Sequence, residues 1–513
     1  MGRTTVVDVI AEVLNQANIA HVWGYEDVRL KEIERRLGRS RWHAVPRQLA
    51  ARCAAGEAEI SSIPGVCIGV RDTKHPHFLE GLIDIKHDRL PVLALVVEPV
   101  SSLSVLTSLS TAATEMGWLS KRYCDYLVRV DRAERAAEII GCALRIALLN
   151  RSTSVVVIPQ ALLDASVETL SVVWTSPVEP LQRPPDHVLD HLAAMLEYSK
   201  RVVLVRGKGC ERADTALFAL AKRLAAPVVH TLVGRQEPDS DHVLDFGVCA
   251  ADTPGERIVM EADCVLLLGA GRFEQIRTRG LMVHLDVNAN ANDPSMALSI
   301  AAETRVTLEG LLEKLMMRDD HGFLEWAKTL RANSAERHTN ARYLDTQLIR
   351  ALDVMTGNDA IFVIDEALPE LMRDMRLDGR RRLVVVPRQG VAATLARAVG
   401  IQSVSKRQVF VISTRDIPLD EWRRLTGQLC ADSSVKVVVW GEKAGMEAEP
   451  STHRTAPDVH QIRLASSDAL AAMRRALAES VSVLIKLYPA MSSQAIVAPD
   501  YQEAASHRPA SGF

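Results

Sequence analysis

The sequence has almost no net charge and no long apolar run. Its 513 residues carry a formal net charge of −3, so no surface-wide field would attract nucleic acid or an anionic membrane. No apolar run reaches the roughly 20 residues that a transmembrane helix needs. Residues 1–16 follow an amphipathic helical pattern rather than a charged segment with an apolar core, so we expect no signal peptide. These absences predict a cytoplasmic protein without nucleic acid or membrane as a partner.

The sequence also lacks paired cysteines. Its eight cysteines are scattered, and none forms a Cys-x-x-Cys pair. Cys67, Cys142 and Cys264 lie inside apolar runs, which is typical of reduced core residues, so neither disulfides nor a metal site is predicted. Cys210 follows a glycine at a predicted helix start, where a thiol pKa is sometimes lowered. Because no base accompanies it, we assign it to the core or a turn.

What the sequence does contain is a repeated alternation of short β-branched runs with helical segments. This pattern predicts parallel sheets covered by helices, an α/β fold. Two stretches interrupt it: the proline-rich Thr175–Asp186 and the polar Asn333–Arg342. They divide the chain into three doubly wound parallel-sheet domains near residues 1–175, 187–333 and 343–498, followed by a tail, 499–513, that is predicted to be disordered. The predicted strands are Val66–Gly69, Val92–Val97, Ser154–Ile158, Val202–Val205, Val228–Leu232, Cys264–Gly269, Val283–Asp286, Ile361–Ile364, Leu383–Val386, Val409–Ile412 and Val435–Trp440.

The last two predicted strands flank a segment with helical apolar spacing, Leu419–Leu429. They therefore form a strand–helix–strand unit. The loop after each strand lies at the edge where α/β proteins bind ligands. These two loops are Ser413–Asp416 and Gly441–Lys443.

A further set of segments carries a family pattern over nearly the whole chain. They are Ile19–Gly24, Gly81–Val97, Leu149–Pro159, Val202–Cys210, Val229–Glu237, Ala262–Gly269, Leu377–Leu383 and Val435–Val439. In them the chain resembles thiamine-diphosphate-dependent enzymes of the pyruvate oxidase, pyruvate:quinone dehydrogenase and acetolactate synthase group. In that group the first and third domains of neighbouring subunits hold the cofactor between them, and the middle domain binds FAD in some members.

The resemblance implies chemical groups that this sequence does not supply. A first-domain glutamate of these enzymes activates the thiazolium, but Arg47 stands at that position, and a guanidinium stays protonated and cannot accept a hydrogen bond. The metal-binding Gly-Asp-Gly is replaced by Thr414-Arg415-Asp416, and the Asn-Asn that follows by Gly441-Glu442. The loop Gly-Pro-Gly-Asn is replaced by Asp72–His75. Of the glycines that approach the diphosphate, only Gly390 remains.

These losses on both sides of one site favour a degenerate member of the group that does not bind Mg²⁺ and thiamine diphosphate. We therefore assign no catalytic and no metal-binding residue, and expect a binding, regulatory or scaffold subunit. An alternative remains open: an active enzyme on a 2-oxo acid such as pyruvate, with an altered site in which Asp416 and Glu442 are a shifted oxygen pair. The sequence names no ligand, partner or pathway.

The middle domain keeps loops that suit a nucleotide. The strand Val202–Val205 leads into a Gly-Lys-Gly turn before a predicted helix, and such a turn exposes backbone N–H groups to a phosphate. In FAD-binding relatives the equivalent loops surround the ADP part, and Asp286 would meet a ribose. The residues expected to bind FAD or another nucleotide are Gly207, Gly209, Thr231, Gly234, Gly269, Arg272 and Asp286. The alternative is that these turns only maintain the fold.

The resemblance also implies assembly into a homodimer or homotetramer, or into a hetero-complex with an active paralogue. The helices near Leu49–Ala55 and Leu395–Val399 keep small and apolar residues, so we expect them to build the contact between subunits. The alternative is that these faces pack within their own domains.

Overall fold

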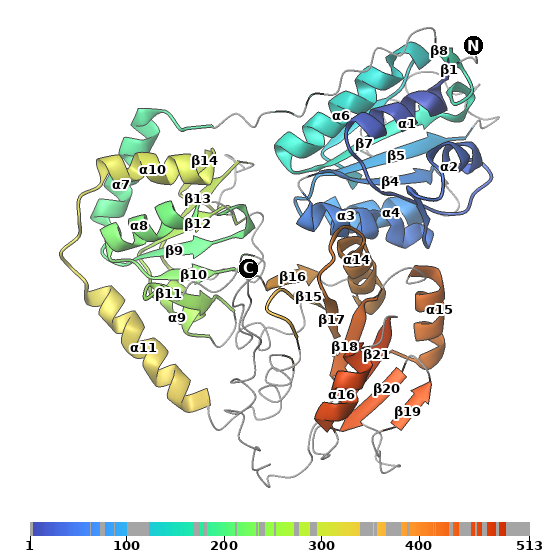
Figure 1. Cartoon of the computed structure of the whole chain (residues 1–513). Coiled ribbons are helices and arrows are strands. Elements are labelled where there is room, and N and C mark those ends of the chain that lie inside the picture. Colours follow the sequence, from blue (N-terminus) through green and yellow to red (C-terminus); the bar gives the residue numbers. More distant parts are fainter. Residues whose placement is uncertain are drawn as a thin grey trace, which may run out of the picture.

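The chain forms three α/β domains, and Figure 1 shows the first domain above the third with the central domain beside them. The computed structural model describes residues 4–488 apart from 62, 72–76, 87, 100–122, 168–174, 176, 178–181, 211–212, 232–233, 235–241, 251–252, 271–275, 277, 288–294, 339–351, 353–355, 366–380, 387–389, 414, 416, 430–433, 441–452, 457–458, 464–468 and 479–481. The predicted fold class is confirmed. The predicted tail lies outside the described residues.

The first domain is a six-stranded parallel sheet in the order β3-β2-β4-β5-β7-β6. Its central strands β4, β5 and β7 are buried almost throughout, because helices cover both faces of the sheet. Its first helix starts with a capping box, in which Asp8 N–H donates to Thr5 Oγ1 and Thr5 N–H donates to Asp8 Oδ2. The elements are β1 Thr4–Thr5, α1 Val6–Gln16, β2 Val22–Gly24, α2 Lys31–Leu37, β3 Trp42–Ala44, α3 Ala50–Ile60, β4 Gly65–Val70, α4 His77–Lys86, β5 Val92–Glu98, β6 Tyr126–Arg129, α6 Ala136–Asn150, β7 Thr153–Pro159 and β8 Ser166–Val167.

The central domain is also a six-stranded parallel sheet, in the order β11-β10-β9-β12-β13-β14. From β9 the chain first builds one side of the sheet and then crosses to β12 to build the other. The boundary between β9 and β12 is therefore the topological switch point, where sheets of this kind form a ligand crevice at the carboxyl ends of the strands. The elements are α7 Asp186–Tyr198, β9 Val202–Arg206, α8 Asp214–Leu224, β10 Val228–His230, β11 Asp245–Val248, α9 Pro254–Met260, β12 Cys264–Leu268, β13 Leu281–Asp286, β14 Leu298–Ala301, α10 Thr304–Lys314 and α11 Gly322–His338.

The third domain has a seven-stranded sheet in the order β16-β15-β17-β18-β21-β20-β19, parallel except for the β19–β20 pair. The strand–helix–strand unit expected from the sequence is present as β17, α15 and β18, and the fully buried Trp422 anchors its helix. The elements are β15 Ile361–Asp365, β16 Arg382–Val386, α14 Gly390–Val404, β17 Val409–Ser413, α15 Leu419–Leu429, β18 Lys436–Trp440, β19 His453–Ala456, β20 Val459–Arg463, α16 Ala469–Ala478 and β21 Val483–Tyr488.

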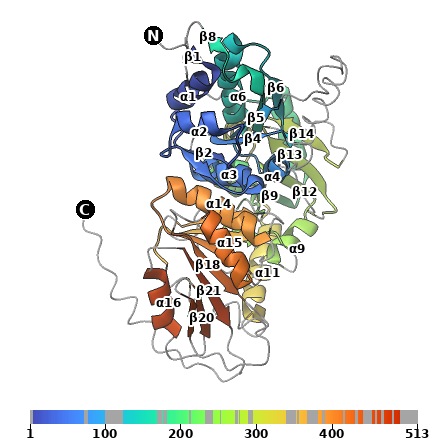
Figure 2. The same ribbon diagram turned by 90° about the vertical axis from the view of Figure 1, so that its right-hand side faces the viewer.

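Two small-residue helices join the first and third domains. Helices α3 and α14 pack directly on one another, and they lie side by side in both Figure 1 and Figure 2. The contact is close because of two glycines: a Cβ on Gly56 would lie 2.1 Å from Arg397 O, and one on Gly400 would lie 2.0 Å from Cys53 O. The pairing of Gly56 with Arg397 and of Gly400 with Cys53 shows that the helices run antiparallel.

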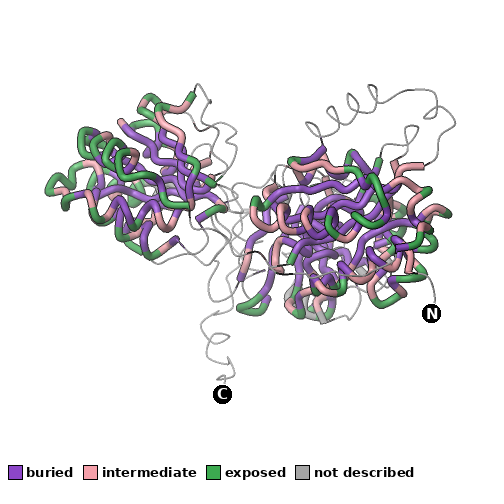
Figure 3. Tube along the Cα trace, turned by 90° about the horizontal axis from the view of Figure 1, so that it is seen from above, coloured by how far each residue is buried: buried purple, intermediate pink, exposed green. Residues whose placement is uncertain are grey.

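This packing corrects one expectation about assembly. The faces near Leu49–Ala55 and Leu395–Val399 are buried against each other within one chain, so they are not an exposed contact for a second subunit. Small residues at both helices mark a close helix crossing, and the sequence does not say whether the crossing lies within a chain or between chains. The same core cluster contains residues of both domains, and Figure 3 shows that the buried residues gather in the interior of the molecule.

No helix in the described part of the chain has the length and apolarity needed to cross a bilayer. The described cysteines form no disulfide. The described residues also contain no group of three or more His, Cys, Asp or Glu side chains that could hold a metal ion.

Candidate functional site

The first half of the expected cofactor site centres on Arg47, which begins a short 3₁₀ turn, η1 (Arg47–Leu49), after β3. Its guanidinium lies over the ring of Tyr25, 4.7 Å from the ring centre, and its Nη2 is 3.4 Å from Asp27 Oδ2. Both oxygens of Asp27 also bind Arg29. The bonds from Arg29 are the main reason that the pKa of Asp27 is lowered, and burial opposes them. Asp27, a carboxylate that contacts Arg47, is therefore held by two arginines.

The second half lies at the N-terminus of α14, where Gly390 adopts a positive φ of 75°. Arg415 follows β17, and its Nη1 would lie 3.8 Å from a Cβ on Gly390. Its backbone N–H donates to Ser413 Oγ, 3.0 Å away. A guanidinium at this helix start would attract an anion but repel Mg²⁺. Thr414, Asp416, Gly441, Glu442 and residues 72–75 lie outside the described residues.

The antiparallel packing of α3 and α14 separates these two halves. Gly56 faces Arg397 and Cys53 faces Gly400, so residues earlier in α3 face residues later in α14. Arg47 precedes α3 and therefore lies beside the C-terminal end of α14, which η1 contacts. Gly390 and Arg415 lie at the other end. With a helical rise of 1.5 Å per residue the halves are about 20 Å apart. A single chain therefore does not bring Arg47 and Arg415 together.

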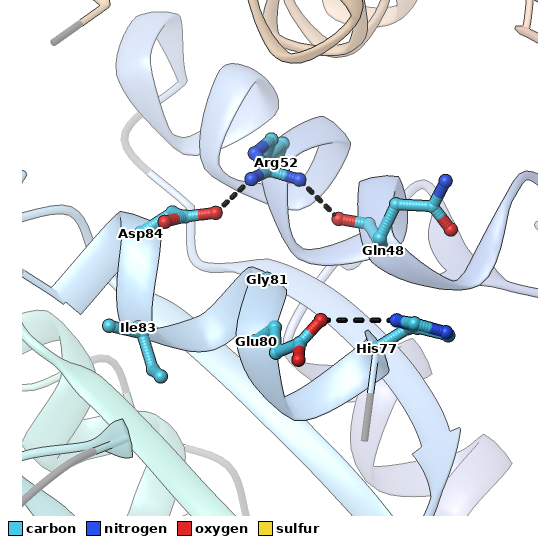
Figure 4. Close-up of a pocket in the computed structure, with 7 residues that line it drawn as sticks. All are labelled: Gln48, Arg52, His77, Glu80, Gly81, Ile83 and Asp84. Carbon is cyan, nitrogen blue, oxygen red and sulfur yellow. Dashed lines mark hydrogen bonds and ion pairs between the residues drawn. The ribbon is translucent and has the colours of Figure 1, made fainter. Parts of the chain in front are cut away.

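A polar pocket of about 490 Å³ lies beside η1, between the starts of α3 and α4. Figure 4 shows its charged side chains arranged in pairs. Arg52 pairs with Asp84 and also donates to Gln48 O, 2.5 Å away, while His77 Nδ1 lies 3.1 Å from Glu80 Oε2. Burial, and then the nearby Arg397, lower the pKa of Arg52 to about 10. Because Arg52 is paired with Asp84 and Glu80 lines the same pocket, the pocket has no excess positive charge for a diphosphate.

In the central domain the structure does bring the predicted loop residues together. A Cβ on Gly207 would lie 2.1 Å from Ala270 Cα, and Gly209 and Gly269 are in similar close backbone contact. Gly269 also needs its positive φ of 54°. However, Gly207 N–H donates to Leu268 O and Gly209 N–H to Gly269 O, at 2.8 and 2.7 Å. These amides are used inside the domain and do not point at a phosphate.

The neighbouring loop is built in the same way. Gly234 N–H donates to Thr231, to the carbonyl oxygen at 3.0 Å and to Oγ1 at 2.9 Å. Thr231 N–H donates in turn to Arg206 O at 2.9 Å. A Cβ on Gly234 would lie 2.4 Å from the same Arg206 oxygen. These glycines are therefore explained by close packing of loops. Arg272 lies outside the described residues.

The two charged groups at these loops face the first domain. Lys208, between the two glycines of the turn, binds Glu59 with an Nζ–Oε1 distance of 2.5 Å. Asp286, at the end of β13, is 3% exposed and pairs with Arg89. The positions expected to contact a phosphate and a ribose are thus occupied by side chains of the chain itself.

Family models match two of the three domains. The model described as "Thiamine pyrophosphate enzyme, N-terminal TPP binding domain" matches residues 4–116, and "Thiamine pyrophosphate enzyme, central domain" matches residues 189–311. The first and central domains belong to the thiamine pyrophosphate enzyme family. This confirms the resemblance found in the sequence.

Individual relatives are distant. An uncharacterized 42.6 kDa protein in the isoamylase 3' region of Pseudomonas amyloderamosa is 27% identical over 338 residues, 63% of this chain and 85% of that protein. Pyruvate oxidase of Lactiplantibacillus plantarum is 23% identical over 433 residues, 78% of this chain and 70% of that enzyme. The solved structure of a thiamine diphosphate-dependent 4-hydroxybenzoylformate decarboxylase of Rhodococcus jostii RHA1 has a TM-score of 0.72 at 18% identity, covering 95% of this chain and 99% of that one. The structural likeness shows the shared fold.

At two described positions, Arg47 and Arg415, the side chains do not supply the groups that the cofactor of these enzymes needs. Arg47 offers no acceptor to a pyrimidine nitrogen, and Asp27 is held by two guanidiniums. Arg415 supplies no oxygen ligand for Mg²⁺. The glycine turns of the central domain are likewise no open phosphate cradle, because their amides are already bonded. We therefore derive no reaction step through either group.

Two features of this family member were not predicted. The pocket beside Arg47 could have been anticipated from Gln48 and Arg52, and from His77 and Glu80, which follow helical spacing. The other feature is a buried Glu57 that accepts from Trp23 Nε1 at 3.0 Å and lies 3.2 Å from His21 Nδ1. It lies near the amino ends of β2 and β4, away from the ligand edge, and we assign it a structural role.

Cys210 has no sign of a reactive thiol. It is fully buried, its Sγ donates to Leu268 O at 3.1 Å, and burial raises its pKa to about 12. The assignment of Cys210 to the core is confirmed.

Proposed function

We propose that the chain is a member of the thiamine pyrophosphate enzyme family that is not catalytic at the family site and acts as a binding, regulatory or scaffold subunit. The observation that carries this proposal is Arg47, whose guanidinium is fixed between Tyr25 and Asp27. By the sequence resemblance it stands at the position where the family mechanism needs a carboxylate. A positive charge there opposes activation of the thiazolium, which requires an acceptor at the pyrimidine ring.

The electrostatics of the site support the same proposal. Burial raises the pKa of Tyr25, whose hydroxyl accepts from Val70 N–H at 2.8 Å. The phenol therefore stays neutral beside Arg47 and does not replace the missing carboxylate. At the other half, Arg415 takes the position of a metal ligand. Both halves have changed in the direction that disfavours Mg²⁺ and an activated thiazolium.

The competing proposal is an active enzyme on a 2-oxo acid with an altered site. It is favoured by the names of relatives, which include a pyruvate oxidase and a 4-hydroxybenzoylformate decarboxylase. It requires that groups other than Arg47 and Arg415 supply the carboxylate and the metal ligands. An absorption spectrum of the purified protein would show whether flavin accompanies it.

Replacing Arg47 by glutamate is expected to restore no decarboxylation of pyruvate. The new carboxylate would supply one half of the site, while the half at Gly390 and Arg415 would still lack a metal ligand. Carbon dioxide release would be measured with Mg²⁺ and thiamine diphosphate for the wild type, Arg47→Glu and Arg47→Ala. The alanine variant is the matched control, because it removes the cation without adding a carboxylate. Release by Arg47→Glu alone would show a competent third domain, and release by the wild type would refute the proposal.

We also propose that the chain assembles into a homodimer or homotetramer, or with an active paralogue. The support is indirect: one chain keeps the two cofactor halves about 20 Å apart, as the helical rise requires, so a complete site of the family kind needs a second chain. Sedimentation of the isolated protein at micromolar concentration is expected to show a species larger than 56.3 kDa. A monomer would contradict the homodimer and the homotetramer, and only the complex with an active paralogue would remain.

A further inference from the structure

Within the part of the chain that the structure describes, ion pairs connect the first domain to both of the other domains. Lys208 Nζ of the central domain lies 2.5 Å from Glu59 Oε1, near the end of α3. Asp286 of the central domain pairs with Arg89, in the connection between α4 and β5. Arg397 of α14 in the third domain pairs with Asp88, the residue before Arg89. Two short segments of the first domain thus bind both other domains.

Each of these pairs contains a side chain that is almost fully buried, although Arg89 is 26% exposed. The side chains of Glu59 and Arg397 are 4% and 2% exposed. Burial makes each partner dependent on the other, since removing one leaves an uncompensated charge in a medium of low dielectric constant. Exposed pairs such as Lys314–Asp190, where Asp190 is 63% exposed, are screened and contribute little.

Glu59 occupies the central position in this network. Besides Lys208, it faces Arg397, whose Nη1 lies 3.8 Å from Glu59 Oε2. Burial alone would raise the pKa of Glu59, but Lys208 and Arg397 outweigh it and the pKa lies below its ordinary value. One carboxylate therefore holds cations from two different domains.

The contact lies at a defined place in the central domain. Lys208 follows β9, in the turn packed against the end of β12, so it belongs to the crevice at the topological switch point. Asp286 ends the next strand, β13. An anionic and a cationic side chain of the first domain, Glu59 and Arg89, each meet the opposite charge there. Side chains of the first domain therefore contact the sheet edge at which sheets of this kind bind ligands.

We propose that these residues form an interdomain clasp in which Glu59 and Arg89 dock into the ligand crevice of the central domain while Glu59 also holds Arg397 of the third. The clasp is an autoinhibitory contact: while it is closed, the crevice is not open to a ligand. Neutralising Glu59 opens it, because Lys208 and Arg397 then lose their common partner.

The closed clasp is not fully satisfied in its hydrogen bonds. Within the described residues, Nε and Nη1 of the buried Arg397 have no hydrogen-bond partner. A buried donor without a partner costs free energy in the closed state. This cost offsets part of the stabilisation by the ion pairs. The free-energy difference between the closed and the open arrangement is therefore smaller than the ion pairs alone would give.

Small-angle scattering and thermal unfolding of the full chain test the clasp. Glu59→Gln is expected to give a larger radius of gyration and a melting temperature several degrees lower, because both contacts are weakened. Lys208→Met should give a smaller change, since Glu59 keeps Arg397. Adding Lys208→Met to Glu59→Gln should recover part of the lost stability, because it removes the cation that Glu59→Gln leaves unpaired. Lys314→Met is the matched control, a central-domain lysine whose ion pair is exposed, and should resemble the wild type.

The proposal is overturned if Glu59→Gln and Lys314→Met give the same radius of gyration and melting temperature. If Glu59→Gln does not fold, Lys208→Met is measured instead. A radius of gyration and a melting temperature equal to those of Lys314→Met would then also overturn the clasp. None of these readouts uses thiamine diphosphate or enzymatic activity. The clasp and the proposed lack of catalysis can therefore fail independently.

Discussion

Replacing Gly400 by alanine is expected to lower the free energy of unfolding by about 3 kcal/mol, as overpacking against a rigid neighbour does. In an exposed helix interior the same change would stabilise by about 1 kcal/mol. Here the new Cβ would lie 2.0 Å from Cys53 O and 2.8 Å from Cys53 C. These are backbone atoms of α3, so relief requires the two helices, and with them the two domains, to move apart.

Gly427→Ala is the control for this prediction. Gly427 lies in helix α15 of the same domain, and a Cβ there would have no other atom within 4 Å. In urea unfolding, Gly400→Ala should lower the free energy of unfolding, whereas Gly427→Ala should not lower it. Equal stability of the two variants would mean that α3 and α14 do not cross as closely as described.

Arg397→Met is expected to destabilise the chain by about 3–5 kcal/mol, the usual effect of removing one partner of a buried ion pair. Methionine keeps much of the volume but removes the cation that pairs with Asp88, which is 10% exposed, and that also faces Glu59. Burial lowers the pKa of Arg397 against the attraction of Glu59, so its charge is held by these carboxylates.

The matched comparison is Arg135→Met, because Arg135 and its partner Asp131 are each 50% exposed. Such a pair contributes about 0.5 kcal/mol, so chemical unfolding should hardly distinguish this variant from the wild type. If Arg397→Met were as stable as Arg135→Met, the ion pairs of α14 would have no role in joining the domains.

The sequence predicted those parts of the fold that depend on local patterns. Runs such as Val92–Val97 and Val409–Ile412 are strands because both faces of a parallel sheet are covered and must be apolar. The short edge strands β3, β6, β11 and β14 have no such run, since an edge strand is only partly covered. The interior strand β21 was missed although Val483, Leu484 and Ile485 signal it clearly.

The charged contacts between domains could not be predicted from one sequence. Lys208 and Glu59 are 149 residues apart, and Arg397 and Asp88 are 309 residues apart. A charge at one position carries no local sign of a partner at such a distance. For the same reason Gly207 and Asp286 resembled nucleotide contacts, whereas the structure gives them packing and docking partners.

Whether the family site still binds its cofactor is tested most directly by titrating the purified wild-type chain with Mg²⁺ and thiamine diphosphate. A ligand at 100 times its dissociation constant stabilises the native state by about 2.7 kcal/mol. We predict no heat of binding and no shift in the melting temperature at about 1 mM cofactor, a concentration that would saturate any site with a dissociation constant of about 10 µM. A melting temperature several degrees higher, accompanied by saturable heat, would contradict the account.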